Sequence, residues 1–368
     1  MALSSAIPIF RSECPPQVWM VEEGLQQVFF ELTGYCNNRC PGCINESFIE
    51  NFASRKFKPG FHHQPLTKEK WVSVLEKLPK SVKTIVLSGG EPTLHTEFFS
   101  IINEIDKRGY QFTIFTNGRW PNPDGLIKTL GRSKNFNGFL ISLHGTTASS
   151  HEAFSGQSNS FAETVDNIRK ASMAKLPITV STVITCQNLD ELKQLPMFAK
   201  ELGAEAISFN RYLYAPDRVS GDAISPPTPE QLKKAIQIIE HNRNLYNGLI
   251  HIGYGPTIPY CFEDSSSLGC SAGEASLVID PWGNVKPCLH VDLLCGNVAQ
   301  DDFDSIWNSR NLKSWRNLAS GSCGGCTVFS SCGGGCRAML LSWGSNQDPL
   351  MNSEFQGNFI SLSQLTGK

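Results

Sequence analysis

The stretch that decides the fold is Gly34-Tyr-Cys36-Asn-Asn-Arg-Cys40-Pro-Gly-Cys43. It directly follows an apolar run, 28–33, whose aromatic and apolar residues indicate a β-strand. The three cysteines have the spacing C-x3-C-x2-C, and iron–sulfur clusters are held by cysteine thiolates. Three thiolates bind three irons of a four-iron cubane and leave the fourth iron for another ligand. The stretch therefore predicts a strand that ends in a cluster-binding loop.

Strand-like and helix-like segments alternate from this loop to about residue 215. The predicted strands are 28–33, 83–88, 111–116, 138–143, 178–185 and 206–210, and the predicted helices are 67–78, 94–108, 124–130, 160–174 and 189–202. Such alternation implies parallel strands joined by right-handed crossovers. Six units are too few to close an eight-stranded barrel. We therefore expect an α/β fold with an open, partial (β/α)6 barrel and ligands at the carboxyl ends of its strands.

The composition changes after the predicted barrel. A loop rich in Pro, Asp and Ser precedes a helix expected from Pro226 to about Tyr246, with Thr228 as its N-cap. The next part is rich in Gly and Cys and has too little core to fold unless metal stabilises it. The expected parts are an N-terminal segment (1–27), the barrel (28–215), a bridging loop and helix (216–254), a cysteine-rich domain (255–340) and a tail (341–368).

The composition also excludes several classes of protein. The net charge of −2 and the scattered Lys and Arg leave no basic surface for nucleic acid or an anionic membrane. No apolar run approaches the ~20 residues of a spanning helix, and the N-terminus lacks a signal peptide. Thirteen cysteines without a secretory signal favour metal or redox chemistry over disulfides. We therefore expect a cytoplasmic protein.

Polar and glycine-rich motifs follow three of the predicted strands. They are Gly89-Gly90-Glu91-Pro92, Thr116-Asn117-Gly118 and Ser142-Leu-His144-Gly. The glycines allow close approach to the backbone, and Glu91 offers a carboxylate. Each motif also suits an ordinary turn. His144 and His151 are either pocket groups or structural histidines.

The second half carries a dense cysteine pattern. Cys270, Gly283 and Cys288 are followed by the spacing C-x2-C-x5-C-x3-C at Cys323, Cys326, Cys332 and Cys336. Paired C-x2-C motifs also suit a zinc ribbon, so the spacing alone is compatible with zinc as well as with iron–sulfur clusters.

Together these motifs resemble the radical S-adenosylmethionine (SAM) family, and the second half resembles the SPASM domain of its peptide-modifying members. The resemblance covers about residues 28–340. It implies that a reduced 4Fe-4S cluster on Cys36, Cys40 and Cys43 cleaves SAM to methionine and a 5′-deoxyadenosyl radical, which abstracts a substrate hydrogen. It also implies one or two auxiliary 4Fe-4S clusters and a reductant such as flavodoxin or ferredoxin.

The resemblance assigns roles to individual residues. The SAM contacts would be Gly89, Gly90, Glu91, Pro92, Thr116, Asn117, Ser142 and Arg211. Arg211 would pair with the SAM carboxylate, or else serve as a surface or interdomain arginine. The first auxiliary cluster would use Cys261, Cys270, Cys288 and Cys336, and the second Cys323, Cys326 and Cys332. The fourth ligand of the second auxiliary cluster would be Cys295, Asp348, Glu354, the substrate or water. Cys14 and Cys186 fit no cluster.

Three features depart from the family pattern or extend it. In the family the residue before the third cysteine is usually aromatic and lies near the adenine of SAM. Here it is Gly42, so the adenine contact would come from Tyr35 or Ile44. His151-Glu-Ala-Phe-Ser155 lacks the arginine of the family's His-Asp-x-x-Arg run. A long loop, 47–65, follows the third cysteine and is expected to cover the site.

The resemblance implies an enzyme that modifies a ribosomally made precursor peptide. The change would be a crosslink, a dehydrogenation, or excision of a tyramine-type fragment that leaves an α-keto-β-amino acid. Small-molecule maturases of tetrapyrrole or cofactor pathways share every motif, and a non-catalytic iron–sulfur carrier would keep the cysteines. An anaerobic sulfatase maturase is less well matched, because Leu289 stands where that group has Asp. With about 27 residues before the first strand, a leader peptide would need a separate small recognition protein.

Overall fold

The computed structural model describes residues 24–41, 43, 64–213, 225–263, 269–318, 323–343 and 348–351. The predictions for Cys14, Gly42, Ile44, Glu354 and most of the loop at 47–65 fall outside these ranges. None of the helices in the described part of the chain has the length and apolar character needed to span a bilayer.

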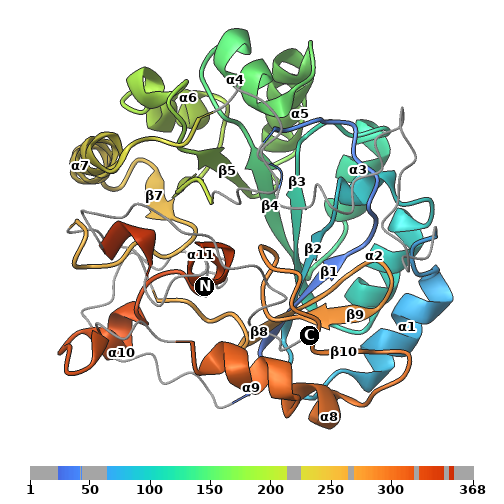
Figure 1. The fold of residues 1–368 in the computed structure, drawn as a ribbon. Helices are drawn as coiled ribbons and strands as arrows, with labels where there is room; N and C mark the ends of the chain where they lie inside the picture. The colour runs from blue at the N-terminus through green and yellow to red at the C-terminus, as the bar shows by residue number, and fades with distance from the viewer. Residues whose placement is uncertain are drawn as a thin grey trace.

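A single ten-stranded sheet forms the framework, in the order β10-β9-β8-β1-β2-β3-β4-β5-β6-β7 (Figure 1). The strands are β1 (Gln27–Glu31), β2 (Thr84–Ser88), β3 (Gln111–Thr116), β4 (Phe136–Ser142), β5 (Ile178–Val183), β6 (Ala206–Asn210), β7 (His251–Tyr254), β8 (Ser276–Ile279), β9 (Asn284–Lys286) and β10 (Gly296–Asn297). The neighbours from β8 through β7 pair in parallel, while β9 and β10 are antiparallel. The prediction of a parallel α/β sheet is therefore confirmed.

Helices surround the strands on the outside, as Figure 1 shows. They are α1 (Lys68–Lys77), α2 (Phe98–Lys107), α3 (Pro123–Leu130), α4 (Ala148–Ser155), α5 (Ser160–Met173), α6 (Leu195–Glu201) and α7 (Pro229–Leu245), with short 3-10 turns η1 (Pro92–Leu94) and η2 (Leu189–Glu191). The helix expected at 189–202 is split into η2 and α6, because Pro196 stands in the first turn of α6 and cannot continue a helix from before it. Thr228 caps α7 in a full capping box, as predicted.

The sheet has two parallel strands more than the six predicted. β7 and β8 have four residues each, which is too short for an alternating pattern to show in the sequence. The sheet nevertheless stays open, because its order ends at β7 and places β8 beside β1. Figure 1 shows α11 (Arg337–Trp343) between β7 and β8.

The cysteine-rich second half is built into the barrel rather than appended to it. β8 pairs with β1 from Gln27↔Ser276 to Phe30↔Ile279. Beside this pairing, Lys286 of β9 and Glu31 of β1 form a 2.8 Å ion pair, and both side chains are almost fully buried. This half also has a core, contrary to the low periodicity of its sequence: Ile306 and Trp315 are buried in two short helices. These are α8 (Phe303–Trp307) and α9 (Arg310–Arg316), followed by α10 (Phe329–Cys332) and η4 (Pro349–Met351).

Candidate active site

The loop after β1 brings its three cysteines together. Cys43 donates its N–H to the carbonyl of Cys40, which folds the loop into a turn. Burial raises the pKa of the Cys40 thiol well above its usual value, and the nearby charges of Cys43 and Cys36 raise it further. Cys40 also packs against buried Phe154 and Tyr212. The three thiols therefore share one partly apolar site, as the cluster prediction requires.

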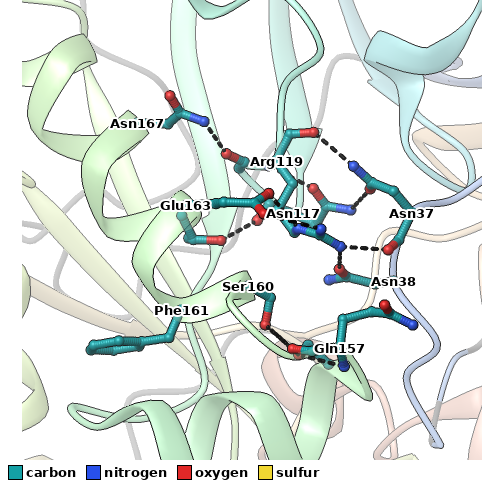
Figure 2. A network of polar contacts seen from close by, with 12 residues as sticks. Asn37, Asn38, Asn117, Arg119, Gln157, Ser160, Phe161, Glu163 and Asn167 are labelled. Atoms are coloured by element: carbon teal, nitrogen blue, oxygen red, sulfur yellow. Dashed lines mark hydrogen bonds and ion pairs between the residues drawn. The ribbon is translucent and has the colours of Figure 1, made fainter.

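Polar side chains from the end of β3 hold the cluster loop in place (Figure 2). The amide of Asn117 donates to Oδ1 of Asn37 at 2.7 Å and to Sγ of Cys36 at 3.7 Å. The guanidinium of Arg119 contacts the carbonyl of Asn37 and, at 3.0 Å, Oδ1 of Asn38. Its other nitrogens bind both carboxylate oxygens of Glu163 on α5, at 2.8 and 3.3 Å.

A second anchor of the loop comes from the turn between α4 and α5. Arg39 donates its N–H to the carbonyl of Ser155 at 2.8 Å. The next residue, Gly156, has φ +64°, and a Cβ there would lie 2.3 Å from the carbonyl oxygen of Arg39. Only glycine allows this approach. Neither anchor was predicted, because no local pattern marks a contact between residues this far apart in the chain.

The Gly89-Gly90-Glu91-Pro92 motif lies against the backbone that leads into the loop. Gly90 donates to the carbonyl of Thr33 and Glu91 to that of Tyr35, both at 2.7 Å. A Cβ on Gly89 would lie 2.6 Å from the Thr33 oxygen, and one on Gly90 would lie 2.3 Å from the Tyr35 oxygen. The two glycines thus allow two protein segments to pack, a reason different from the ligand approach expected from sequence.

The carboxylate of Glu91 is fully buried and accepts hydrogen bonds from inside the protein. The donors are the N–H and hydroxyl of Thr93, the hydroxyl of Thr116 and the N–H of Asn117, at 2.6–3.2 Å. Burial raises the pKa of Glu91 despite these bonds. In this structure the side chain of Glu91 fixes the β3 end against η1. Its predicted contact with SAM stays a prediction.

Small polar groups line up at the carboxyl ends of the next strands. Ser142 of β4 is half-buried and pairs in register with Ser181 of β5. The amide of Asn210, at the end of β6, donates to the hydroxyl of Ser181 at 2.7 Å. These residues lie at the same sheet end as Thr116 and Asn117, so the structure brings most of the predicted SAM contacts to one edge.

The two histidines after β4 are structural. Nδ1 of His144 accepts the N–H of Val183, and Nδ1 of His151 accepts the N–H of His144, each at 3.2 Å. Their rings stack at 5.7 Å, and both are buried. Burial lowers the pKa of His144 well below its usual value and that of His151 to about 4, with help from the charge of Arg119 at His151. Both rings are therefore neutral at physiological pH.

Arg211 pairs with the C-terminal part of the chain in this structure. Its two terminal nitrogens bind both carboxylate oxygens of Asp348 at 2.8 Å, and one also donates to the carbonyl of Thr257. Asp348 further accepts the N–H groups of Cys336 and Leu350. Both side chains are buried and engaged, and the predicted roles of Arg211 at SAM and of Asp348 at a cluster stay predictions.

The cysteines of the second half influence one another's pKa values, and their assignment to two clusters stays a prediction. Charges on Cys270 and Cys336 raise the pKa of Cys288, after burial as the main cause. Burial raises the pKa of Cys261, and the charges of Cys332, Cys323 and Cys326 raise it further.

Two cysteines of the described part lie away from these groups. The thiol of Cys295 is buried and donates to the carbonyl of Leu293, with Ser309 and Arg316 nearby. Cys186 donates to the carbonyl of Pro226 and lies close to Gln231.

The grouped thiols fit iron–sulfur clusters in their chemistry. Burial raises the pKa of Cys36 to about 11 and of Cys336 to about 11, so without metal these thiols hold their protons. Cluster iron supplies the positive charge that stabilises thiolates. No three described Cys, His, Asp or Glu side chains converge on a single-ion site. A cubane needs no such convergence, because it binds each thiolate through a separate iron.

Comparison with known families identifies the site. Residues 30–199 match the radical SAM superfamily. The chain carries a radical SAM domain. Residues 270–327 match the SPASM family, an iron–sulfur cluster-binding domain, which decides the second half in favour of iron–sulfur clusters over zinc. The protein is thus a radical SAM enzyme whose cofactors are SAM, a 4Fe-4S cluster and auxiliary iron–sulfur clusters.

Several curated proteins resemble this radical SAM enzyme along most of its length. The subtilosin biosynthesis protein AlbA of Bacillus subtilis is 29% identical over 81% of this chain and 66% of AlbA. An AdoMet-dependent heme synthase of Methanosarcina barkeri is 25% identical over 84% of this chain and 90% of its own length. The mycofactocin maturase MftC of Mycobacterium tuberculosis is 27% identical over 89% of this chain and 83% of MftC.

The fold also matches solved structures. SuiB of Streptococcus suis, bound to S-adenosylmethionine, superposes with a TM-score of 0.72 at 16% identity, over 89% of this chain and 77% of SuiB. This likeness confirms the radical SAM type of sheet.

Proposed function

We propose that this radical SAM enzyme modifies a ribosomally made precursor peptide. The observation that carries the proposal is the similarity to AlbA, a bacteriocin biosynthesis protein, over 81% of the chain. MftC, a mycofactocin maturase, is similar over 89% of the chain. SuiB, which has the same fold, has been seen with its precursor peptide SuiA. Crosslinking, dehydrogenation and excision of a tyramine-type fragment are the candidate reactions.

In this proposal Cys36, Cys40 and Cys43 hold the radical SAM cluster, and the SAM pocket lies at the ends of β2, β3 and β4. When bound, the cluster and SAM supply a radical that abstracts hydrogen from the substrate. The protein's part is to orient the reactants and to exclude water. Phe154 and Tyr212 shield Cys40 from solvent. The Asn117 amide donates to the sulfur of Cys36, a contact that tunes the potential of a bound cluster.

The proposal includes partners. We expect a separate small protein to bind the leader part of the peptide, by adding a peptide strand to an exposed sheet edge. A small electron carrier such as flavodoxin or ferredoxin would reduce the cluster. The leader-binding protein should raise peptide turnover far more than it changes SAM binding.

The experiment is co-expression with a short peptide encoded beside the gene, followed by mass spectrometry. A loss of two hydrogens indicates crosslinking or dehydrogenation, and a larger loss indicates excision of a fragment. The Cys36→Ala/Cys40→Ala/Cys43→Ala variant is the control and should leave the peptide unchanged. An unmodified peptide with active wild-type enzyme and leader-binding protein present would contradict the proposal.

A second candidate is a small-molecule maturase. The heme synthase of Methanosarcina barkeri favours it, because this chain covers 90% of that protein's length. Incubation with tetrapyrrole substrates, SAM and reductant separates the two functions. Substrate-dependent formation of 5′-deoxyadenosine with a tetrapyrrole, and none with peptide, would support this candidate.

A further inference from the structure

The buried pair of Arg211 and Asp348 joins the end of a barrel strand to the C-terminal part of the chain. Both terminal nitrogens of Arg211 donate to the carboxylate of Asp348 at 2.8 Å. The exposed fraction is 2% for the side chain of Arg211 and 0% for that of Asp348. Two parallel hydrogen bonds of this kind fix both side chains in one geometry. The pair is therefore a fixed contact inside the protein, unlike an exposed ion pair, which water and salt weaken.

The carboxylate of Asp348 also holds the backbone of Cys336. Its Oδ2 accepts the N–H of Cys336 at 2.8 Å, and its Oδ1 accepts the N–H of Leu350 at 3.0 Å. Each oxygen thus accepts one hydrogen bond from Arg211 and one from the main chain. The residue before Cys336 is Gly335, with φ +88°, and a Cβ there would lie 2.7 Å from Oδ2 of Asp348. Glycine at 335 therefore leaves room for the carboxylate beside Cys336.

Arg211 brings this contact to the carboxyl end of the barrel strands. It directly follows Asn210, the last residue of β6, and its guanidinium also donates to the carbonyl of Thr257 at 3.0 Å. Cys336 directly precedes α11, which lies between β7 and β8 (Figure 1). Parallel α/β sheets bind their ligands at this end. The pair thus holds a predicted auxiliary-cluster cysteine beside the ligand-binding edge of the barrel.

The next residue along the chain lies at the other cluster site. Tyr212 is buried and packs with Phe154 against Cys40 of the cluster loop. Arg211 reaches Cys336 through the carboxylate of Asp348. Two consecutive side chains at the end of β6 therefore connect the surroundings of Cys40 with those of Cys336.

The charges of the pair bear on electron transfer as well as on position. The reduction potential of an iron–sulfur cluster depends on nearby charge and on hydrogen bonds around its ligands. A carboxylate beside Cys336 disfavours the addition of an electron to a cluster held there, because like charges repel. The guanidinium of Arg211 offsets this effect, so the pair as a whole adds no net charge.

We propose that Arg211 and Asp348 are positioning residues of the auxiliary cluster that Cys336 binds. Asp348 holds the main chain of Cys336, while Arg211 fixes the carboxylate and balances its charge. This gives Asp348 a place behind a ligand instead of among the ligands, and gives Arg211 a role at a cluster instead of at SAM. The proposal rests on the predicted ligand role of Cys336 and is independent of the proposed peptide substrate.

The test is a redox titration followed by electron paramagnetic resonance (EPR) of the full chain, reconstituted without air. Every protein in the titration carries Cys36→Ala/Cys40→Ala/Cys43→Ala, so that only auxiliary clusters contribute. Cys336→Ser identifies the signal of the cluster concerned, because that signal should change or disappear. Two unaltered auxiliary signals in Cys336→Ser overturn the proposal.

Charge variants of the pair should shift the potential of that signal in opposite directions. Arg211→Gln leaves the carboxylate unbalanced and should shift the potential downward. Asp348→Asn leaves the guanidinium unbalanced and should shift it upward. The double variant Arg211→Gln/Asp348→Asn has neither charge and should return toward the value of the parent protein. Shifts of the same sign in the two single variants, or no shift in either, overturn the proposal.

Two further variants separate this role from a purely structural one. Ile306→Ala is the matched control, because it removes a buried apolar side chain from α8 in the same half of the chain. It should lower the stability to urea without moving the potential. Arg211→Lys keeps the charge, so it should shift the potential less than Arg211→Gln and should retain iron where Arg211→Gln loses it. Equal iron loss in both Arg211 variants contradicts the role of the charge.

The predicted contact of Arg211 with SAM gives a different result. It is measured by SAM binding to Arg211→Gln in protein that keeps Cys36, Cys40 and Cys43. Weaker SAM binding together with an unshifted auxiliary potential would assign Arg211 to SAM and overturn the proposal.

Discussion

Arg119 connects three parts of the barrel through one side chain. It follows β3, contacts Asn37 and Asn38 of the cluster loop, and pairs with Glu163 of α5. Its charge also lowers the pKa of Cys36, in opposition to burial. Its guanidinium bonds reach neither a thiol nor a predicted SAM contact, although its backbone N–H donates to Oδ1 of Asn117. We therefore regard Arg119 as a positioning residue for the loop.

The first prediction concerns this residue. Arg119→Ala should lower iron retention at the loop and SAM cleavage by roughly 10- to 100-fold, since residues behind metal ligands have effects of that size. The measurement is iron content and 5′-deoxyadenosine formation, with exposed Arg132→Ala as the control. Glu163→Gln should have a smaller effect in the same direction. Equal activity of the Arg119 and Arg132 variants would remove the positioning role.

The second prediction concerns pH and His151. Its pKa is lowered to about 4 in the folded state, whereas in the unfolded chain it is near 6.5. Between these values the unfolded state binds more protons, so stability decreases as the pH falls from about 6.5 to 4. The full effect is at most about 3 kcal/mol. Urea unfolding at several pH values should show this decrease, and His151→Asn should reduce it.

The control for this experiment is His251→Asn, at an exposed position on β7. The asparagine at 151 keeps an oxygen that can accept the N–H of His144, so the loss of a hydrogen bond does not mask the change in slope. An identical pH dependence in wild type and His151→Asn would show that other groups cause it.

At the scale of elements, glycines allow the loops of the site to pack. The Gly89-Gly90 turn after β2 lies against the backbone of Thr33 and Tyr35, and Gly156 before α5 lies against Arg39. Both contacts involve carbonyl oxygens of the main chain, which cannot rotate away as a side chain can. The cluster loop is thus held on two sides by backbone that leaves no room for a methyl group.

Gly90→Ala tests this packing. Its Cβ would lie 2.3 Å from the Tyr35 oxygen, so the turn or the loop must move. We expect a loss of about 1–3 kcal/mol in unfolding free energy, together with weaker iron binding. Gly131→Ala is the control, because a Cβ there meets only one atom, the Ile127 oxygen at 3.2 Å. A Gly90 variant as stable as the Gly131 variant would show that the turn adapts.

The sequence predicted most elements of the barrel but few of its long-range contacts. The bounds of β3 and β6 were predicted without error, because their apolar runs are clear and end in polar residues. β7 to β10 were missed, since two to four residues show no period. The pairing of Arg211 with Asp348 was also missed. They lie 137 positions apart, and no local pattern records such a pair.

At the scale of the whole molecule, the two halves share one sheet and one core. β8 extends the sheet beside β1, and the ion pair of Lys286 with Glu31 lies buried at this junction. Arg211 and Asp348 form a second buried pair between the barrel and the C-terminal part. We therefore expect the halves to unfold as one unit rather than independently.

The prediction at this scale concerns the Lys286–Glu31 pair. Lys286→Met should destabilise the protein by about 3–5 kcal/mol, because it leaves a buried carboxylate without its countercharge. The double variant Glu31→Leu/Lys286→Met should recover most of that loss, since apolar residues can replace a buried pair. Urea unfolding measures both. A double variant no more stable than Lys286→Met would show that the pair has a role beyond charge balance.

The pairing of β1 with β8 has a consequence for how the protein is made. Strand β1 leaves the ribosome long before its second neighbour, which begins only at Ser276. Until then the nascent chain carries an unpaired strand edge, which is a template for aggregation. Contacts so distant in sequence also slow folding. During synthesis of this enzyme there is thus a period in which the cluster loop has been made but β8, the last parallel strand of the sheet, has not.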